Sequence, residues 1–79
     1  MTVRAKFKYE RKEINKYEHG EYVTLCFYPV TSNSSENKSF WDATPSGELK
    51  IQVANKIAVE YFQLGKEYYL DFSDASVWN

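Results

Sequence analysis

The segment from residue 33 to residue 47 concentrates the side chains that could bind a ligand. It places two adjacent aromatic residues, Phe40 and Trp41, in a polar stretch that has no periodic apolar face. The polar groups around them are amides, hydroxyls and one cation: Asn33, Asn37, Lys38, Ser39, Thr44 and Ser46. Aromatic rings stack on nucleobases, whereas cations, hydroxyls and free backbone N–H groups bind phosphate. The composition of this segment favours a nucleotide site.

The segment ends in a Thr-Pro-Ser-Gly turn at residues 44–47. Proline suits the second position of a tight turn, and glycine suits a later one. A turn of this kind needs no ligand and is by itself more typical of a plain connector. In a binding site, the hydroxyls of Thr44 and Ser46 and the backbone N–H groups of the turn would face a phosphate.

The aromatic pair is also ambiguous when it is taken alone. Two adjacent aromatic residues occur more often in a core or a subunit interface than in a ligand platform. With Asn37 and Lys38 beside them, the balance moves towards a site, with Trp41 as the stacking candidate. Arg4 and Lys6 alternate with apolar residues near the N-terminus and could add positive charge to the same pocket.

Catalytic and metal chemistry find little support in the sequence. The single histidine, His19, precedes a glycine in a charged turn, and nothing links it to Cys26 or to a serine as a nucleophile requires. Asp71 and Asp74 are spaced as solubilising acids near a strand end rather than as a hydrolytic pair. Glycine-rich phosphate loops are absent, and the scattered carboxylates lack metal-ligand spacing. We therefore expect a binding protein without enzymatic activity, metal or cofactor.

Size and composition predict one small domain spanning residues 1–79. The chain has a single cysteine, so it cannot form an intrachain disulfide. Its net charge of −1 disfavours a general polyanion binder. The N-terminus lacks the apolar region of a signal peptide, and the longest apolar runs are too short to span a bilayer. We expect no membrane partner. Cations outnumber acids over residues 1–20 and the reverse holds over residues 60–79, a pattern most typical of solvated strand faces.

The elements that must position these side chains follow from apolar periodicity. Alternation predicts four strands and helical spacing predicts one short helix: strands at 2–10, 21–28, 48–53 and 67–73, and a helix capped by Asn55 that carries Ile57, Ala58, Tyr61, Phe62 and Leu64 and ends at Gly65. The first two strands are expected to form a hairpin with a long connection. A loop covers residues 31–47, and residues 76–79 are expected to form a loose tail.

The predicted fold class is mainly β with one short helix, in the order β-β-loop-β-α-β. A small curled antiparallel sheet fits this order, and so does an OB-like or SH3-like barrel. Such a sheet has two open edges, and a chain of 79 residues buries only a modest core. We therefore expect a homo-oligomer, as a dimer or a tetramer.

One stretch of the sequence carries a resemblance to a known family. Glu36-Asn37-Lys38, Phe40-Trp41 and Ala43-Thr44-Pro45-Ser46-Gly47 are followed by an alternating strand, a short helix and Gly65-Lys66-Glu67-Tyr68-Tyr69-Leu70-Asp71-Phe72. Together with the opening Met1-Thr2-Val3-Arg4-Ala5-Lys6-Phe7, this pattern resembles a widespread family of small phage proteins that includes the viral anti-CBASS sponges. The resemblance spans most of the chain.

CBASS is a bacterial defence in which a cyclic nucleotide signal switches on a killing effector. The resemblance implies a phage immune-evasion protein in the host bacterial cytoplasm that binds a cyclic dinucleotide such as 3′3′-cGAMP without cleaving it. It also implies pockets between subunits, with Asn37, Lys38, Phe40, Trp41, Thr44 and Ser46 as the motif residues. Nucleic acid is not a partner in this interpretation.

Two alternatives remain open from the residues themselves. An OB-like protein that binds single-stranded nucleic acid would show a steep salt dependence. A structural or partner-binding phage protein would use Phe40 and Trp41 as interface anchors and would bind no nucleotide.

Overall fold

The computed structural model describes residues 3–30 and 46–78. Along the chain the elements are β1 (Val3–Tyr17), β2 (Gly20–Pro29), β3 (Leu49–Val53), α2 (Lys56–Tyr61), β4 (Glu67–Phe72) and a terminal 3₁₀ helix, η1 (Ala75–Trp78). The predicted fold class, mainly β with one short helix, is confirmed. The stretch expected to be a loose tail overlaps η1, whose start is fastened by hydrogen bonds from the backbone and hydroxyl of Ser76 to the Asp74 carboxylate.

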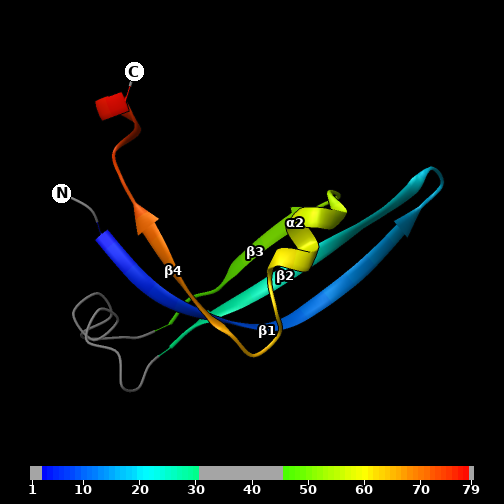
Figure 1. The fold of residues 1–79 in the computed structure, drawn as a ribbon, viewed down its shortest axis with the longest axis horizontal. Coiled ribbons are helices and arrows are strands. Elements are labelled where there is room, and N and C mark those ends of the chain that lie inside the picture. Colours follow the sequence, from blue (N-terminus) through cyan, green and yellow to red (C-terminus); the bar gives the residue numbers. More distant parts are fainter. Residues whose placement is uncertain (1–2, 31–45, 79) are drawn as a thin grey trace.

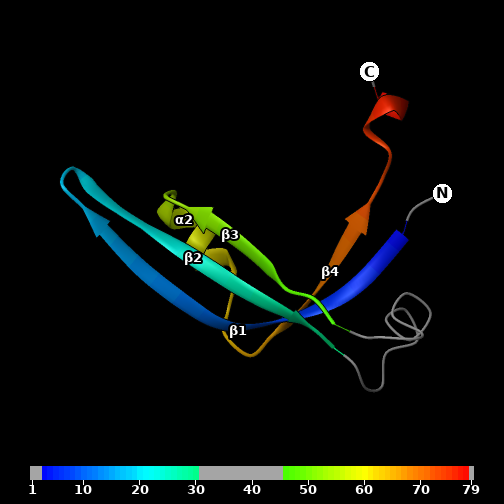
Figure 2. The same ribbon diagram turned by 180° about the vertical axis from the view of Figure 1, so that it is seen from behind.

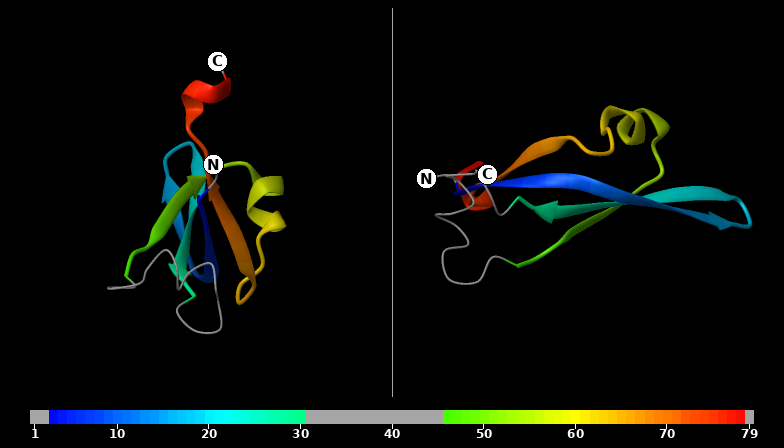
Figure 3. Two further views of the ribbon diagram at one scale, coloured as in Figure 1. Left: turned by 90° about the vertical axis from the view of Figure 1, so that its left-hand side faces the viewer. Right: turned by 90° about the horizontal axis from the view of Figure 1, so that it is seen from below.

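The four strands form one antiparallel sheet in the order β3-β2-β1-β4. The sheet curls into a half-barrel, with β3 and β4 at its two edges and α2 packed on its inner side (Figure 3). β1 is central because its first half pairs with β4 and its second half pairs with β2. The chain therefore builds two faces on one sheet, an inner face under the helix and an outer face.

The β1–β2 hairpin is longer than the sequence pattern indicates, and its expected long connection is wrong. β1 continues to Tyr17, and only the two turn residues 18–19 separate it from β2. Residues 11–17 were missed because they are mostly charged and exposed, so they show no apolar alternation. A bulge between Tyr9 and Arg11, with Glu10 as the extra residue, also shifts by one position which side chains face inward. The tip of the β1–β2 hairpin projects away from the helix (Figures 1 and 2).

The core lies on the inner face of the sheet. Ala5, Phe7 and Tyr9 of β1 pack beside Leu25 and Phe27 of β2. The ring of Tyr9 stacks on that of Phe27 with centroids 5.1 Å apart. Burial raises the pKa of the Tyr9 phenol above its usual value. Aromatic residues thus supply most of the core volume, as expected for a chain this small.

Helix α2 covers this core with only part of the apolar set that the sequence assigned to it. Asn55 caps the helix as expected, because its Oδ1 accepts hydrogen bonds from the backbone N–H groups of Ile57 and Ala58 at 2.9 and 3.3 Å. Val59 and Phe62 pack against the core. Ile57 is 81% exposed, and Tyr61 and Leu64 also face solvent, although the sequence places them at the same helical spacing as Phe62. A helix of six residues has room for only one core-facing stripe, and here both sides carry apolar residues.

The connection from α2 to β4 is fixed to β1 rather than to the helix. The helix ends at Tyr61, so Gly65 is not its terminal cap as predicted. Gly65 instead adopts φ +88°, a conformation that favours glycine, and its N–H donates to the Tyr9 carbonyl at 2.8 Å. The Tyr9 N–H in turn donates to the Lys66 carbonyl at 3.0 Å. This exchange fixes the start of β4 beside the bulge.

Candidate functional site

The outer face of the sheet carries the charged and phenolic side chains. Cross-strand pairs share a face, and the register places Arg4 opposite Asp71, Lys6 opposite Tyr69, and Lys8 opposite Tyr28 and Glu67. Continuing along β1 and across β2 and β3 adds Arg11, Glu13, Tyr22, Thr24, Cys26, Lys50 and Gln52. Five cations therefore share this face with three carboxylates, although the whole chain has a net charge of −1. We call this surface the basic face.

Arg4 and Tyr69 form the most ordered part of the basic face. The Arg4 guanidinium carbon lies 4.6 Å from the centroid of the Tyr69 ring. Its Nε and Nη2 donate to the two carboxylate oxygens of Asp71 at 2.6 and 3.3 Å. The hydrogen bond from Arg4 holds the pKa of the Asp71 carboxyl below its usual value. This geometry presents a planar, bidentate donor beside an aromatic ring, which suits both carboxylate and phosphate.

Lys6 approaches Tyr69 from the neighbouring position on β1. Its Nζ lies 5.5 Å from the ring centroid and 3.8 Å from a carboxylate oxygen of Glu67. A cavity of about 210 Å³ opens here and is lined by Lys6, Glu67, Tyr68 and Tyr69. Tyr69 is 52% exposed, so much of its ring is open to solvent. The basic face thus offers a hollow with a cation and an aromatic surface side by side.

The second half of the basic face is held together by its own side chains. Nη2 of Arg11 donates to the Tyr28 hydroxyl at 3.3 Å and to the Cys26 sulfur at 3.7 Å, while Nη1 lies 3.1 Å from Glu13. Tyr28 chiefly, and then Cys26 and Glu13, raise the pKa of Arg11. Cys26 is fully buried beneath this network. This region is better suited to stabilising the hairpin than to binding a ligand.

Two of the residues predicted to bind ligand are described by the structure. Arg4 lies on the basic face with the contacts given above, and Ser46 is exposed just before β3. Both belong to the same end of the sheet, because the backbone beyond β2 meets β1 through the Val30 N–H and the Lys6 carbonyl at 3.0 Å. The other predicted residues lie outside the described residues: Asn37, Lys38, Phe40, Trp41 and Thr44.

Sequence reasoning named Lys6, with Arg4, as a possible source of positive charge for the pocket, but it missed the contact of Lys6 with Tyr69. They are far apart in the chain and become neighbours only through the antiparallel register of β1 and β4. The available signal was the alternation itself, which placed Lys6 beside Arg4 on the polar side of one strand and Tyr69 beside Asp71 on the polar side of another. The pairing of these two strands was not deducible from alternation.

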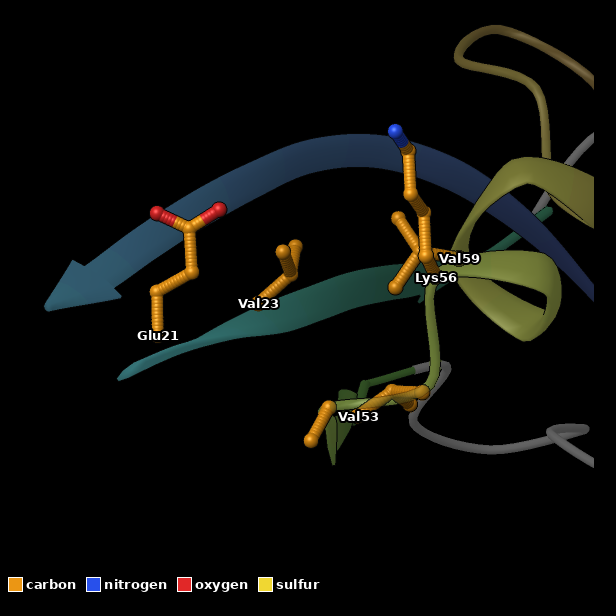
Figure 4. Close-up of a pocket in the computed structure, with 6 residues that line it drawn as sticks. Glu21, Val23, Val53, Lys56 and Val59 are labelled. Atoms are coloured by element: carbon orange, nitrogen blue, oxygen red, sulfur yellow. The ribbon is translucent and has the colours of Figure 1, made fainter. Parts of the chain in front are cut away.

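A second hollow lies on the inner side of the sheet, at the Val53 end of β3. It has a volume of about 260 Å³, and Val23, Val53 and Val59 form its apolar floor. Glu21 and Lys56 stand at its rim, with their charged ends on the same side of the pocket (Figure 4). We call it the valine pocket. An apolar floor with one acid and one base at the mouth suits a small ligand or a partner's side chain.

The groups considered for catalysis are not assembled by the fold. His19 sits exposed at the hairpin tip, with Glu18 3.9 Å from its Nε2, whereas Cys26 is buried within β2. Within residues 3–30 and 46–78, no three His, Cys, Asp or Glu side chains gather closely enough to hold a metal ion. None of the helices in these residues has the length and apolar character needed to cross a membrane.

Comparison with known proteins adds no relative. Neither the protein-family models, nor the curated proteins, nor the solved structures contain a match to this chain.

Proposed function

We propose that this protein binds a cyclic dinucleotide and sequesters it without chemical change, as a phage protein that blunts a cyclic-nucleotide defence signal. The observation that carries the proposal is the cluster of Arg4, Lys6 and Tyr69, where two cations flank one exposed aromatic ring. A cyclic dinucleotide presents two bases and two phosphates, so it needs this combination twice. The motif at residues 37–46 supplies further groups of the same chemistry in the sequence.

The ion pairs on the basic face do not stand in the way of a phosphate. Arg4 and Asp71 have side chains that are 50% and 42% exposed. An ion pair exposed to this extent contributes only about 0–1 kcal/mol. A charged hydrogen bond to a phosphate contributes roughly 1.5–3 kcal/mol. Arg4 can therefore exchange its carboxylate partner for a ligand at little cost.

The affinity required of a sponge is within reach of these groups. Stacking of a base on an aromatic ring contributes on the order of 1–3 kcal/mol. Two stacked bases and two charged hydrogen bonds to each of the two phosphates, supplied symmetrically by two subunits, contribute about 8–18 kcal/mol before association costs. A nanomolar dissociation constant corresponds to a binding free energy of about −12 kcal/mol, which the upper part of this range reaches after an association cost of about 4 kcal/mol. Binding of this kind needs no nucleophile or general base.

Isothermal titration calorimetry with a panel of cyclic dinucleotides tests the proposal directly. We expect saturable binding of at least one member, such as 3′3′-cGAMP, and much weaker binding of the corresponding linear dinucleotide. Chromatography of the ligand after release should return it intact. If no cyclic dinucleotide of the panel binds, the proposal is contradicted. If the released ligand is chemically altered, the protein is an enzyme and does not merely sequester the ligand.

Binding of single-stranded nucleic acid is a second candidate, favoured by the spread of cations and tyrosines over the whole basic face. Curled sheets with such a face bind single-stranded nucleic acid by stacking its bases on aromatic side chains and by contacts between cations and its phosphates. This function predicts affinity that falls steeply with salt. Fluorescence anisotropy with a labelled oligonucleotide at 50 and 200 mM salt distinguishes it from the binding of a compact dinucleotide, for which the loss should be modest.

A further inference from the structure

The β3 edge of the sheet has the sequence pattern of a self-pairing strand. β3 reads Leu-Lys-Ile-Gln-Val and pairs only with β2 among the described residues. It contains only one charged residue and neither a proline nor a bulge. Charged residues, prolines and bulges are the features that protect edge strands from pairing with other chains. The opposite edge, β4, carries Glu67 and Asp71. β3 is therefore the edge that is better suited to pairing with another strand.

We propose that two copies of this chain pair antiparallel through β3, with Ile51 on the twofold axis. In this register Leu49 of each copy lies opposite Val53 of the other, and Lys50 lies opposite Gln52. Apolar side chains then meet on the inner face and a cation meets an amide on the outer face, so both halves of the contact are complementary. The alternating five-residue pattern, centred on an apolar residue, is compatible with its own reversal.

The shortage of buried surface explains why a second copy is the partner. Among the described residues, six hydrophobic side chains are buried, while eight large ones are exposed. A chain of this size buries little apolar surface by itself and is therefore only marginally stable. Burying its exposed apolar side chains against a second copy would add stability. Ile51 itself is 38% exposed at the edge. A second copy of the chain, unlike a different protein, is present at the same concentration as the chain itself.

The charge on β3 is compatible with the same register. Lys50 lies directly opposite Gln52 of the second copy, so no two like charges are directly opposed along the strand.

Cross-linking of Ile51→Cys tests the twofold register. Directly opposed residues have Cα atoms about 4.5–5.5 Å apart, within disulfide range, so oxidation should convert most of this variant to a covalent dimer. Gln52→Cys is the matched control, since its copies lie diagonally at about 7–8 Å and should cross-link poorly. Cys26 is fully buried and does not compete. Equal cross-linking of the two variants, or none in either, would overturn the proposed register.

A charge test uses variants that leave the core untouched. Gln52→Lys places a cation opposite Lys50 of the second copy, and Gln52→Glu places an anion there. Analytical ultracentrifugation should show that the lysine variant dimerises roughly 2- to 30-fold more weakly than the wild type, and the glutamate variant more tightly. Identical dimerisation of both variants, or a wild type that stays monomeric, would contradict the pairing. Calorimetry on the same samples separates the two proposals: a dimer that binds no dinucleotide refutes only the proposed function, and a monomer that binds it refutes only the pairing.

Discussion

The two faces of the sheet divide stability from recognition. The inner face holds Phe7, Tyr9, Leu25 and Phe27 under a short helix, and its aromatic rings contact one another. The outer face holds five cations and three carboxylates in partly exposed pairs. Substitutions on the inner face should therefore change folding, and substitutions on the outer face should change binding while leaving folding nearly intact. Because neighbouring residues of one strand point to opposite faces, the chain provides matched controls for each test.

The largest expected effect is on the inner face. Phe27→Ala removes a buried ring that contacts Tyr9, Phe62 and Tyr68 with centroids 5.1–6.1 Å away. The free energy of unfolding should fall by roughly 3–5 kcal/mol, enough to leave much of the protein unfolded. Urea denaturation followed by circular dichroism measures this change. Ile57→Ala, at an exposed position, should change stability by less than about 0.5 kcal/mol; similar losses for both would contradict the assignment of the core.

The next effect is on the outer face and concerns binding. Arg4→Ala removes the bidentate donor beside Tyr69 and should weaken dinucleotide binding roughly 10- to 100-fold. Its unfolding free energy should change by less than about 1 kcal/mol, because the pair with Asp71 is exposed. Calorimetry and urea denaturation of the same sample measure both quantities. Lys12→Ala is the control, since the bulge places this cation on the other face; equal losses of affinity would show general charge attraction.

A smaller effect follows from the helix that covers the inner face. Asn55→Ala removes the side-chain oxygen that accepts hydrogen bonds from two backbone N–H groups at the start of α2. Thermal and urea denaturation should register a loss of about 1 kcal/mol. Asn55→Ser retains a capping oxygen and should lose much less. If alanine and serine behaved alike, the cap would not contribute to the stability of the inner face.

The smallest effect is the titration of Asp71. The hydrogen bond from Arg4 lowers the pKa of this carboxyl in the folded state. The stabilisation is thus present above the ordinary carboxyl pKa and is lost as the pH falls through the lowered value. The carboxyl carbon signal of Asp71 in an NMR titration should have its midpoint below the usual range. In Arg4→Ala the midpoint should return towards that range, and an unchanged midpoint would mean that another group lowers it.

The sequence predicted the strands well where the alternation was unbroken. Residues 21–28, 48–53 and 67–73 each correspond to an observed strand, and Asn55 caps the helix as expected. It failed beyond Glu10, because residues 11–17 are mostly charged and a bulge reverses which of them face inward. It also failed for Ile57 and Tyr61, since spacing alone cannot choose between two apolar faces of a six-residue helix.

The candidate site was less predictable than the fold. Arg4 was recognised as a polar strand residue, but its contact with Tyr69 depends on the pairing of β1 with β4. Strand pairing is a long-range choice decided by packing of the whole inner face, which local patterns do not record. The residues of the Phe40-Trp41 motif remain a prediction from the sequence.

Two adjacent tyrosines offer the most direct measurement of the central claim. Tyr69 lies on the basic face beside Arg4, while Tyr68 points inward, and its hydroxyl accepts the Gln63 N–H at 2.8 Å. In protein labelled with fluorotyrosine, Tyr68→Phe and Tyr69→Phe assign the two ¹⁹F signals. Titration with the tightest-binding cyclic dinucleotide should shift the Tyr69 signal saturably and leave the Tyr68 signal nearly unchanged. A shift of Tyr68 alone, or no shift of Tyr69 at saturating ligand, would contradict recognition by the basic face.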